Sequence, residues 1–324
     1  MCTAQKDRAC LSFVRVNKLC TEEQMDTDGP SGSTEIDLKR FDPAMIKPHR
    51  IVVAIGKRGT GKSILLRDLM YSQRDKIEYA IAMSPTREAS EGFRRVLPPT
   101  SVYDEYDGDV VTQMLEMQRE RANTSGMDSL RNLALVLDDC MYDKTVMKSK
   151  TMRNLFMNGR HYKCFFLAAV QWLMDLGPDL RTQVDYVFAL RENILSNRER
   201  LYKYFFGIFP KYEDFSRVFD ACTANYECLV IDNTVNSNNV EDCIFWYKAS
   251  VDIPDFRMCA PVYWELDRKR GGAGAPGEDR QGGHAGTAPE PSVVATRPTR
   301  SAPRLRRIVK HKGGTLPGIP ERVA

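Results

Sequence analysis

The stretch Gly56-Lys57-Arg58-Gly59-Thr60-Gly61-Lys62-Ser63 matches the pattern G-x-x-x-x-G-K-[ST]. Its glycines let backbone N–H groups curl around phosphate oxygens, Lys62 reaches the β and γ phosphates, and the Ser63 hydroxyl can ligate Mg²⁺. The apolar run 51–55 precedes it and a helical pattern follows at 63–71, which is the strand, loop and helix order of a phosphate-binding loop. The stretch predicts nucleotide binding and leaves the reaction open, because kinases, GTPases, transporters and motors share it.

Two adjacent carboxylates, Asp138 and Asp139, end the apolar run 133–137, some 75 residues after the loop. In this position we expect Asp138 to hold the Mg²⁺ and Asp139 to accept a proton from the attacking water. Hydrolysing motors usually carry Glu at the second position. Asp139 is one methylene shorter, so the water must sit closer or the backbone must shift.

A third polar residue, Gln171, follows the next apolar run at 164–170. A side-chain amide at the end of such a strand can hydrogen-bond the attacking water or the γ-phosphate. It can then report the loss of the γ-phosphate to the rest of the molecule. Taken alone, a glutamine after a strand is an ordinary solvated strand end. Its place after the acidic strand favours the catalytic interpretation.

Short apolar or β-branched runs alternate with longer amphipathic segments along the chain. The expected strands are 50–55, 79–83, 133–137, 164–170, 184–190, 227–232 and 243–248. The expected helices are 61–71, 88–96, 110–121 and 148–162. Continuous apolar strands separated by helices predict an α/β fold with a mainly parallel central sheet flanked by helices, and the last two strands predict an antiparallel C-terminal addition.

The ends of the chain differ from this middle part. Residues 1–35 are polar and predict a flexible N-terminal segment before a domain at 36–268. From 269 to 324, 17 of the 56 residues are Gly or Pro, and 11 Lys and Arg stand against 4 Asp and Glu. Such a composition buries too little apolar area to offset chain entropy, so this basic tail is expected to be disordered.

The bulk composition is that of a soluble globular protein. The chain has 324 residues, of which 42% are hydrophobic and 28% charged, and a mean hydropathy of −0.42. Its longest apolar run, 164–170, is too short to span a bilayer, so no transmembrane segment is expected. The nine cysteines contain no Cys-x-x-Cys pair, which argues against a disulfide framework or a zinc site.

Five motifs together resemble the virion packaging ATPases of nucleocytoplasmic large DNA viruses, which belong to the FtsK and HerA superfamily. They are the phosphate loop, Leu135 to Cys140 (Leu-Val-Leu-Asp-Asp-Cys), Asn158 to Tyr162 (Asn-Gly-Arg-His-Tyr), the strand that ends in Gln171, and Tyr226 to Asn233. The resemblance covers roughly residues 40–250. It implies a RecA-like P-loop NTPase in which the strand before Gln171 lies between the P-loop strand and the acidic strand.

The resemblance also implies ATP and Mg²⁺ as cofactors, a ring-shaped homo-oligomer, double-stranded DNA in its pore, and capsid or portal components as partners. In such rings an arginine of the neighbouring subunit stabilises the transferred phosphoryl group. Arg160, Arg181 and Arg191 are the candidates. We favour Arg181, because its segment leads into a strand much as in the cellular translocases.

Other residues have weaker interpretations. His161 either lines the pore or holds a helix end, and Lys148, Lys150 and Arg153 either contact DNA phosphates or form an ordinary solvated face. Trp172 and Trp246 are expected to pack and not to stack on bases. The basic stretch 304–312 either binds DNA, acts as a nuclear address or only keeps the chain soluble.

The expected function is an ATP-driven translocase that packages viral double-stranded DNA into the capsid. Its expected location is the virion and the virus factory of the host cytoplasm, with the host nucleus left open. A related DNA translocase or helicase in viral replication or resolution is the first alternative. The second is a nucleotide-dependent assembly switch without motor activity, in which Asp139 is a poor base.

Overall fold

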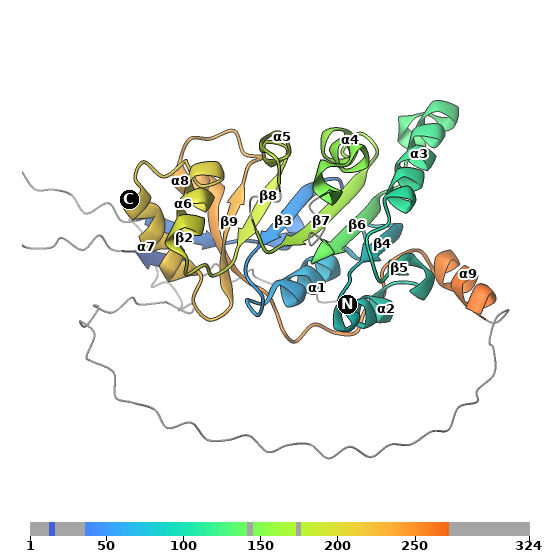
Figure 1. Cartoon of the computed structure of the whole chain (residues 1–324), viewed down its shortest axis with the longest axis horizontal. Coiled ribbons are helices and arrows are strands. Elements are labelled where there is room, and N and C mark those ends of the chain that lie inside the picture. Colours follow the sequence, from blue (N-terminus) through green and yellow to red (C-terminus); the bar gives the residue numbers. More distant parts are fainter. Residues whose placement is uncertain (1–12, 17–35, 141–144, 173–175, 272–324) are drawn as a thin grey trace, which may run out of the picture.

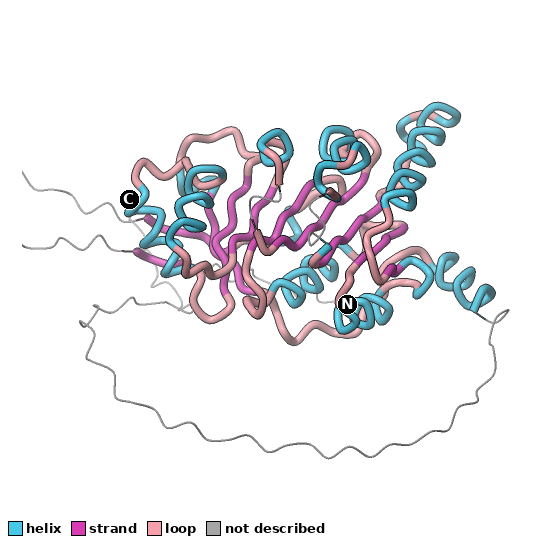
Figure 2. Tube along the Cα trace, in the orientation of Figure 1, coloured by secondary structure: helices cyan, strands magenta, loops and turns pink. Residues whose placement is uncertain are grey.

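A single mixed sheet organises the computed structural model, which describes residues 13–16, 36–140, 145–172 and 176–271. Within these residues the sheet has ten strands in the order β1-β2-β10-β9-β8-β3-β7-β6-β4-β5. Their bounds are β1 (Phe13–Val16), β2 (Ile36–Arg40), β3 (Ile51–Ile55), β4 (Tyr79–Met83), β5 (Val102–Tyr103), β6 (Leu133–Asp138), β7 (Cys164–Val170), β8 (Tyr186–Ala189), β9 (Glu227–Asp232) and β10 (Ile244–Lys248). Figure 2 shows the strands as one layer between helices.

The six strands from β8 to β5 in this order run parallel to one another. Strand β9 is antiparallel to β8, and β10 is antiparallel to β9. Strand β7, which precedes Gln171, lies between β3 and β6, as the resemblance implies. The predicted fold class, a RecA-like P-loop α/β fold with an antiparallel C-terminal addition, is confirmed.

Helices cover both faces of the sheet (Figure 1). Their bounds are α1 (Lys62–Gln73), α2 (Arg87–Val96), α3 (Gly108–Ser125), α4 (Lys150–Asn158), α5 (Pro178–Arg181), α6 (Leu195–Tyr204), α7 (Tyr212–Cys222), α8 (Val240–Cys243) and α9 (Pro261–Gly271). Side chains of α3, α4, α6 and α7 bury one face, and those of α1 and α2 bury the other.

Strand β3 shows why these runs form a doubly covered sheet. All five of its residues are buried, and alternate side chains enter opposite cores: Val53 joins the core under α3 and α4, whereas Val52 and Ala54 join the core under α1. Helix starts are set by caps such as Asp107, whose carboxylate accepts the N–H groups of Asp109 and Val110 at the start of α3.

A strap of residues 249–260 follows β10 and crosses the face that carries α1 and α2 (Figure 1). The Ser250 N–H donates to Asp68 of α1 at 3.1 Å, and the Met258 N–H donates to the Val96 carbonyl at the end of α2 at 2.8 Å. The Phe256 ring meets Tyr71 edge-on at 5.2 Å between centroids. The strap therefore connects the two ends of the sheet over the helix that follows the phosphate loop.

The predicted flexible ends lie mainly outside the described residues. Within the predicted N-terminal segment, Phe13–Val16 form β1, which pairs with β2. At the other end, residues 269–271 complete α9, and the remaining tail with its 304–312 stretch is not described. Among the described helices, none is long and apolar enough to cross a membrane.

Candidate active site

The phosphate loop joins β3 to α1 and has the backbone that its glycines permit. Gly59 and Gly61 have φ values of +78° and +96°, which only glycine adopts without strain. A Cβ at Gly56 would lie 2.7 Å from Oγ1 of Thr60, so a larger residue does not fit there. The Thr60 hydroxyl donates to the Lys57 carbonyl at 2.7 Å and closes the turn. The loop thus places the N-terminus of α1 where an anion can bind.

Lys62 occupies the first position of α1 and is only 8% exposed. Its Nζ donates to the Lys57 carbonyl at 3.0 Å. Burial lowers the pKa of Lys62, while the nearby carboxylates of Asp139 and Asp138 act in the opposite direction. The negative charge of a triphosphate bound at this loop would favour the charged form of the Lys62 ammonium group, which burial disfavours.

Ser63 and Asp138 meet at the carboxyl edge of the sheet, where the Ser63 hydroxyl donates to Oδ2 of Asp138 at 3.0 Å. Asp138 is the last residue of β6 and is 3% exposed. Burial raises its pKa, although the Ser63 hydrogen bond and Lys62 act to lower it. A buried carboxylate beside a hydroxyl fits Mg²⁺, which takes hard oxygen ligands and leaves other positions to phosphates and water.

Asp139 and Gln171 come together because β6 and β7 are neighbouring parallel strands. The Gln171 Nε2 donates to Oδ1 of Asp139 at 2.5 Å. Asp139 has φ +58°, in the left-handed region. A non-glycine residue held in that region costs on the order of 1–3 kcal/mol, and such residues cluster at functional sites. At this turn the carboxylate of Asp139 meets the amide of Gln171.

One hollow of about 570 Å³ unites these groups. Its lining includes Lys62, Ser63, Asp138, Asp139 and Gln171. This volume lies within the range of roughly 300–1,000 Å³ that small-molecule sites occupy. Of the predicted catalytic residues, all but Arg181 line it.

Arg181 lies elsewhere, at the end of α5, and is 7% exposed. Its guanidinium stacks over the Tyr204 ring at 4.2 Å from the centroid. A contact with a nucleotide on a neighbouring subunit would require this arginine to leave Tyr204. The other two arginine candidates, Arg160 and Arg191, are exposed.

The residues suggested for DNA contact or helix support lie apart from the hollow. His161, Lys148, Lys150 and Arg153 are exposed, and Arg153 pairs with Asp179 at 2.7 Å. These positions stay predictions.

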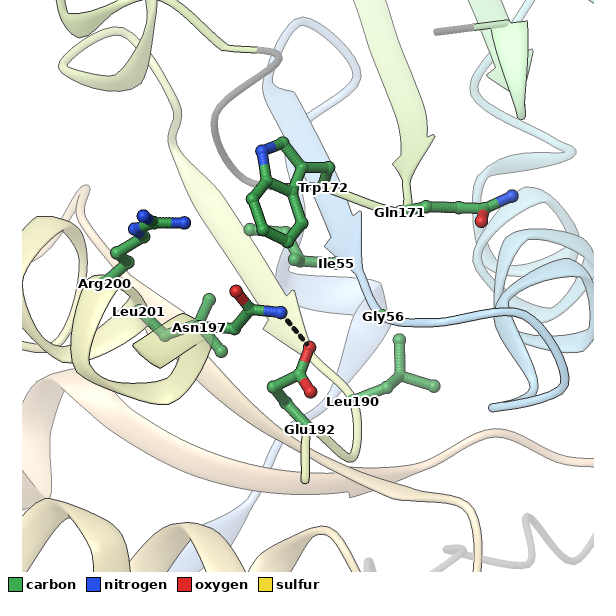
Figure 3. Close-up of a pocket in the computed structure, with 9 residues that line it drawn as sticks. All are labelled: Ile55, Gly56, Gln171, Trp172, Leu190, Glu192, Asn197, Arg200 and Leu201. Atoms are coloured by element: carbon green, nitrogen blue, oxygen red, sulfur yellow. Dashed lines mark hydrogen bonds between the residues drawn. The ribbon is translucent and has the colours of Figure 1, made fainter. Parts of the chain in front are cut away.

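Sequence reasoning missed an ion pair that supports the loop from the β8 side. The Lys57 ammonium lies 2.7 Å from Oε1 of Glu192, which is 6% exposed, and Asn197 donates to the other carboxylate oxygen at 3.0 Å. Figure 3 shows Asn197 to the left of Gly56 and Glu192 below it, joined by a dashed line, with Gln171 and Trp172 above. The fit of Glu192 to Lys57 depends on β8 lying beside β3, so the sequence carries no local signal for it.

A second missed residue is Tyr226, which lines the same hollow although it lies more than 160 positions after the loop. Tyr226 begins the last of the five motifs and precedes an expected strand, but the sequence predicts no role for its side chain.

Replacing Asp138 with asparagine is expected to stabilise the nucleotide-free protein. Because the folded pKa of Asp138 is raised, ionisation costs stability as pH rises through that pKa, and the cost disappears below the unfolded pKa. Asparagine removes the buried charge and keeps an oxygen for Ser63. Thermal denaturation near pH 7 should show a Tm higher by about 2–4 °C, the shift that roughly 1 kcal/mol produces in a domain of this size.

The gain in Tm from Asp138→Asn should shrink as the pH is lowered, because the wild-type carboxyl then becomes neutral. The exposed Asp128→Asn is the matched control and should leave the Tm unchanged. A Tm for Asp138→Asn at or below that of the wild type would show that the surroundings stabilise the carboxylate.

Two proteins of invertebrate iridescent viruses are similar to the chain. Protein 088R of Invertebrate iridescent virus 3 is 35% identical over 229 residues, which cover 67% of this chain and 86% of 088R. Protein 075L of Invertebrate iridescent virus 6 is 31% identical over 251 residues, which cover 74% of this chain and 96% of 075L. Both are uncharacterised proteins, and no family model matches the chain.

Two solved structures align with part of the chain. The genome packaging NTPase B204 of Sulfolobus turreted icosahedral virus 2, in complex with ATP-gammaS, aligns with a TM-score of 0.46 and 19% identity over 64% of this chain and all of B204. ATPases 2 and 3 of EssC from Geobacillus thermodenitrificans align with a TM-score of 0.44 and 13% identity over 73% of this chain and 46% of that one.

The sheet order and the phosphate loop at the start of α1 define a RecA-like P-loop NTPase fold. Within that class, the chain belongs to a family of large DNA virus proteins that includes 088R and 075L. This membership confirms the kind of virus that the motif resemblance implies.

Proposed function

We propose that the chain is a Mg²⁺-dependent ATPase that uses ATP hydrolysis to move viral double-stranded DNA into the capsid. One observation carries the proposal: a phosphate loop, a Ser63–Asp138 contact of 3.0 Å and an Asp139–Gln171 pair all line one hollow. A simple phosphate-binding protein needs only the first of these. The carboxylate and amide next to the loop are the groups that a hydrolase needs to activate water.

The chemistry divides among the residues as follows. Lys62 exchanges the Lys57 carbonyl for oxygens of the β and γ phosphates. Ser63 and Asp138 would hold Mg²⁺, which neutralises charge on the phosphates when bound. Asp139 accepts the proton of the attacking water, and Gln171 orients both the carboxylate and the water.

The motor part of the proposal includes a ring of identical subunits around duplex DNA, with capsid or portal components as partners. An arginine of the adjacent subunit, Arg181 or one of the exposed Arg160 and Arg191, would complete the site. The proposal also puts the protein in the virion and in the virus factory of the host cytoplasm, with the host nucleus left open; relatives from large DNA viruses support it.

Long linear duplex DNA is expected to raise ATP turnover by the purified full-length protein several-fold. The reason is that a translocase reaches its catalytic geometry when it is bound to DNA. The measurement is phosphate release with duplex, with single-stranded DNA of equal length and without DNA. Turnover that ignores DNA would contradict the motor and leave an assembly switch as the better account.

Packaging and replication roles separate in a second assay. With empty capsids and branched replication intermediates offered together, a packaging ATPase should associate with the capsids in an ATP-dependent manner. Preference for branched DNA would instead favour the replication or resolution translocase.

A further inference from the structure

The turn before β9 has an uncommon backbone. Asn225 and Tyr226 follow one another with φ +55° and +61°, and the Glu227 N–H closes the turn on the Ala224 carbonyl at 3.0 Å. Asparagine visits the left-handed region readily, but a tyrosine there is rare. Strained backbone conformations of this kind cluster at functional sites, so the position of the Tyr226 side chain is a candidate for a function.

That side chain is exposed beside the phosphate loop. Tyr226 is 71% exposed, although its ring lies against the loop: its Cδ1 is 3.5 Å from the point that a Cβ on Gly61 would occupy. Within the described residues, the aromatic and cation–π contacts all involve other side chains. An aromatic face is thus open at the rim of the hollow that also contains Lys62 and Ser63.

We propose that Tyr226 is the stacking platform for the nucleobase of the triphosphate bound at the phosphate loop. The inference deepens the proposed function and rests on it. Lys62 and Ser63 fix the phosphates at the start of α1, and Tyr226 lies beside the residue just before that helix, so the base can reach the ring without crossing the core. Ile64 on the exposed side of α1 lines the same hollow and adds apolar surface.

Stacking on an aromatic ring does not read the edges of a base. The platform therefore accepts both adenine and guanine, and purines are favoured over pyrimidines because they offer more area. The ligand class is a purine nucleoside triphosphate.

The test compares ATP with inorganic tripolyphosphate, which has the phosphates but no base. Tyr226→Ala should weaken ATP binding by about 5- to 150-fold, the range that loss of one stacking contact produces, and leave tripolyphosphate binding unchanged. Tyr226→Phe should bind ATP as the wild type does. Tyr226→Leu, which keeps an apolar group against Gly61 without an aromatic face, should resemble Tyr226→Ala. Calorimetric titration of the full-length protein measures all of these.

Two outcomes overturn the inference without touching the proposed function. If Tyr226→Ala binds ATP as tightly as the wild type, the base lies elsewhere. If it weakens ATP and tripolyphosphate equally, the tyrosine only holds the loop in shape. Failure of the proposed function looks different, since it appears in the wild type, as ATP turnover that ignores DNA or as binding of neither ligand.

Discussion

Replacing Lys62 with alanine is expected to lower the rate of ATP hydrolysis about 100- to 1,000-fold, the loss that removal of one buried charge-stabilising donor causes in other enzymes. The ammonium group is buried at the N-terminus of α1. Among the described residues its hydrogen bond goes to a loop carbonyl and it forms no salt bridge, so it can turn to the phosphates. No other lysine lines the hollow within the described residues. The measurement is steady-state phosphate release.

The matched control for Lys62→Ala is Lys47→Ala, which removes an exposed ammonium group away from the hollow and should leave turnover unchanged. Because Lys62 is proposed to contact the β and γ phosphates, Lys62→Ala should also weaken ATP binding. The thermal stability of the nucleotide-free protein should hardly fall. If the Lys62 variant turned over ATP at the wild-type rate, the loop would not be the hydrolytic site.

Replacing Asp139 with asparagine is expected to lower turnover about 100- to 10,000-fold, the contribution of a general base. The substitution keeps the shape of the side chain and an oxygen for the Gln171 amide, and it also suits the left-handed backbone at this position. ATP binding should therefore persist while hydrolysis is lost. This separation of binding from turnover distinguishes Asp139 from Lys62.

Asp128→Asn controls for the loss of one negative charge. Asp128 is exposed and precedes β6 in the sequence. Single-turnover hydrolysis and nucleotide binding should be measured on the same preparations. Hydrolysis at the wild-type rate in Asp139→Asn would show that another group accepts the proton of water.

The central strands could be predicted from sequence because each is a continuous apolar run that both helix layers bury. Strands β4, β7 and β9 have the predicted bounds, and β3, β6, β8 and β10 differ by one or two residues at an end. Strand β2 was missed because it is short, alternates in polarity and pairs with β10, some 200 residues later. Helices α6 and α7 were not predicted either; in α6 only Leu201 is buried, so its pattern carries no apolar stripe.

The meeting of Asp138, Asp139 and Gln171 could be predicted, because parallel strands bring their carboxyl ends to one edge of the sheet. Glu192 and Tyr226 could not, since their relation to the loop exists only after β8 and the turn before β9 are in place. The role proposed for Arg181 would involve a neighbouring subunit, which the sequence of one chain does not describe.

The strap of residues 249–260 has a consequence for the order of events during synthesis. Asp68 on α1 receives its partners from Tyr247 and Ser250, so the helix behind the phosphate loop is covered only by chain that the ribosome makes almost 200 residues later. A nascent chain that has emerged as far as Gln171 carries Lys62, Ser63, Asp138, Asp139 and Gln171, yet α1 still lacks the strap on that side. We therefore expect nucleotide to be retained only after the strap has left the ribosome, which would keep unfinished chains from consuming ATP.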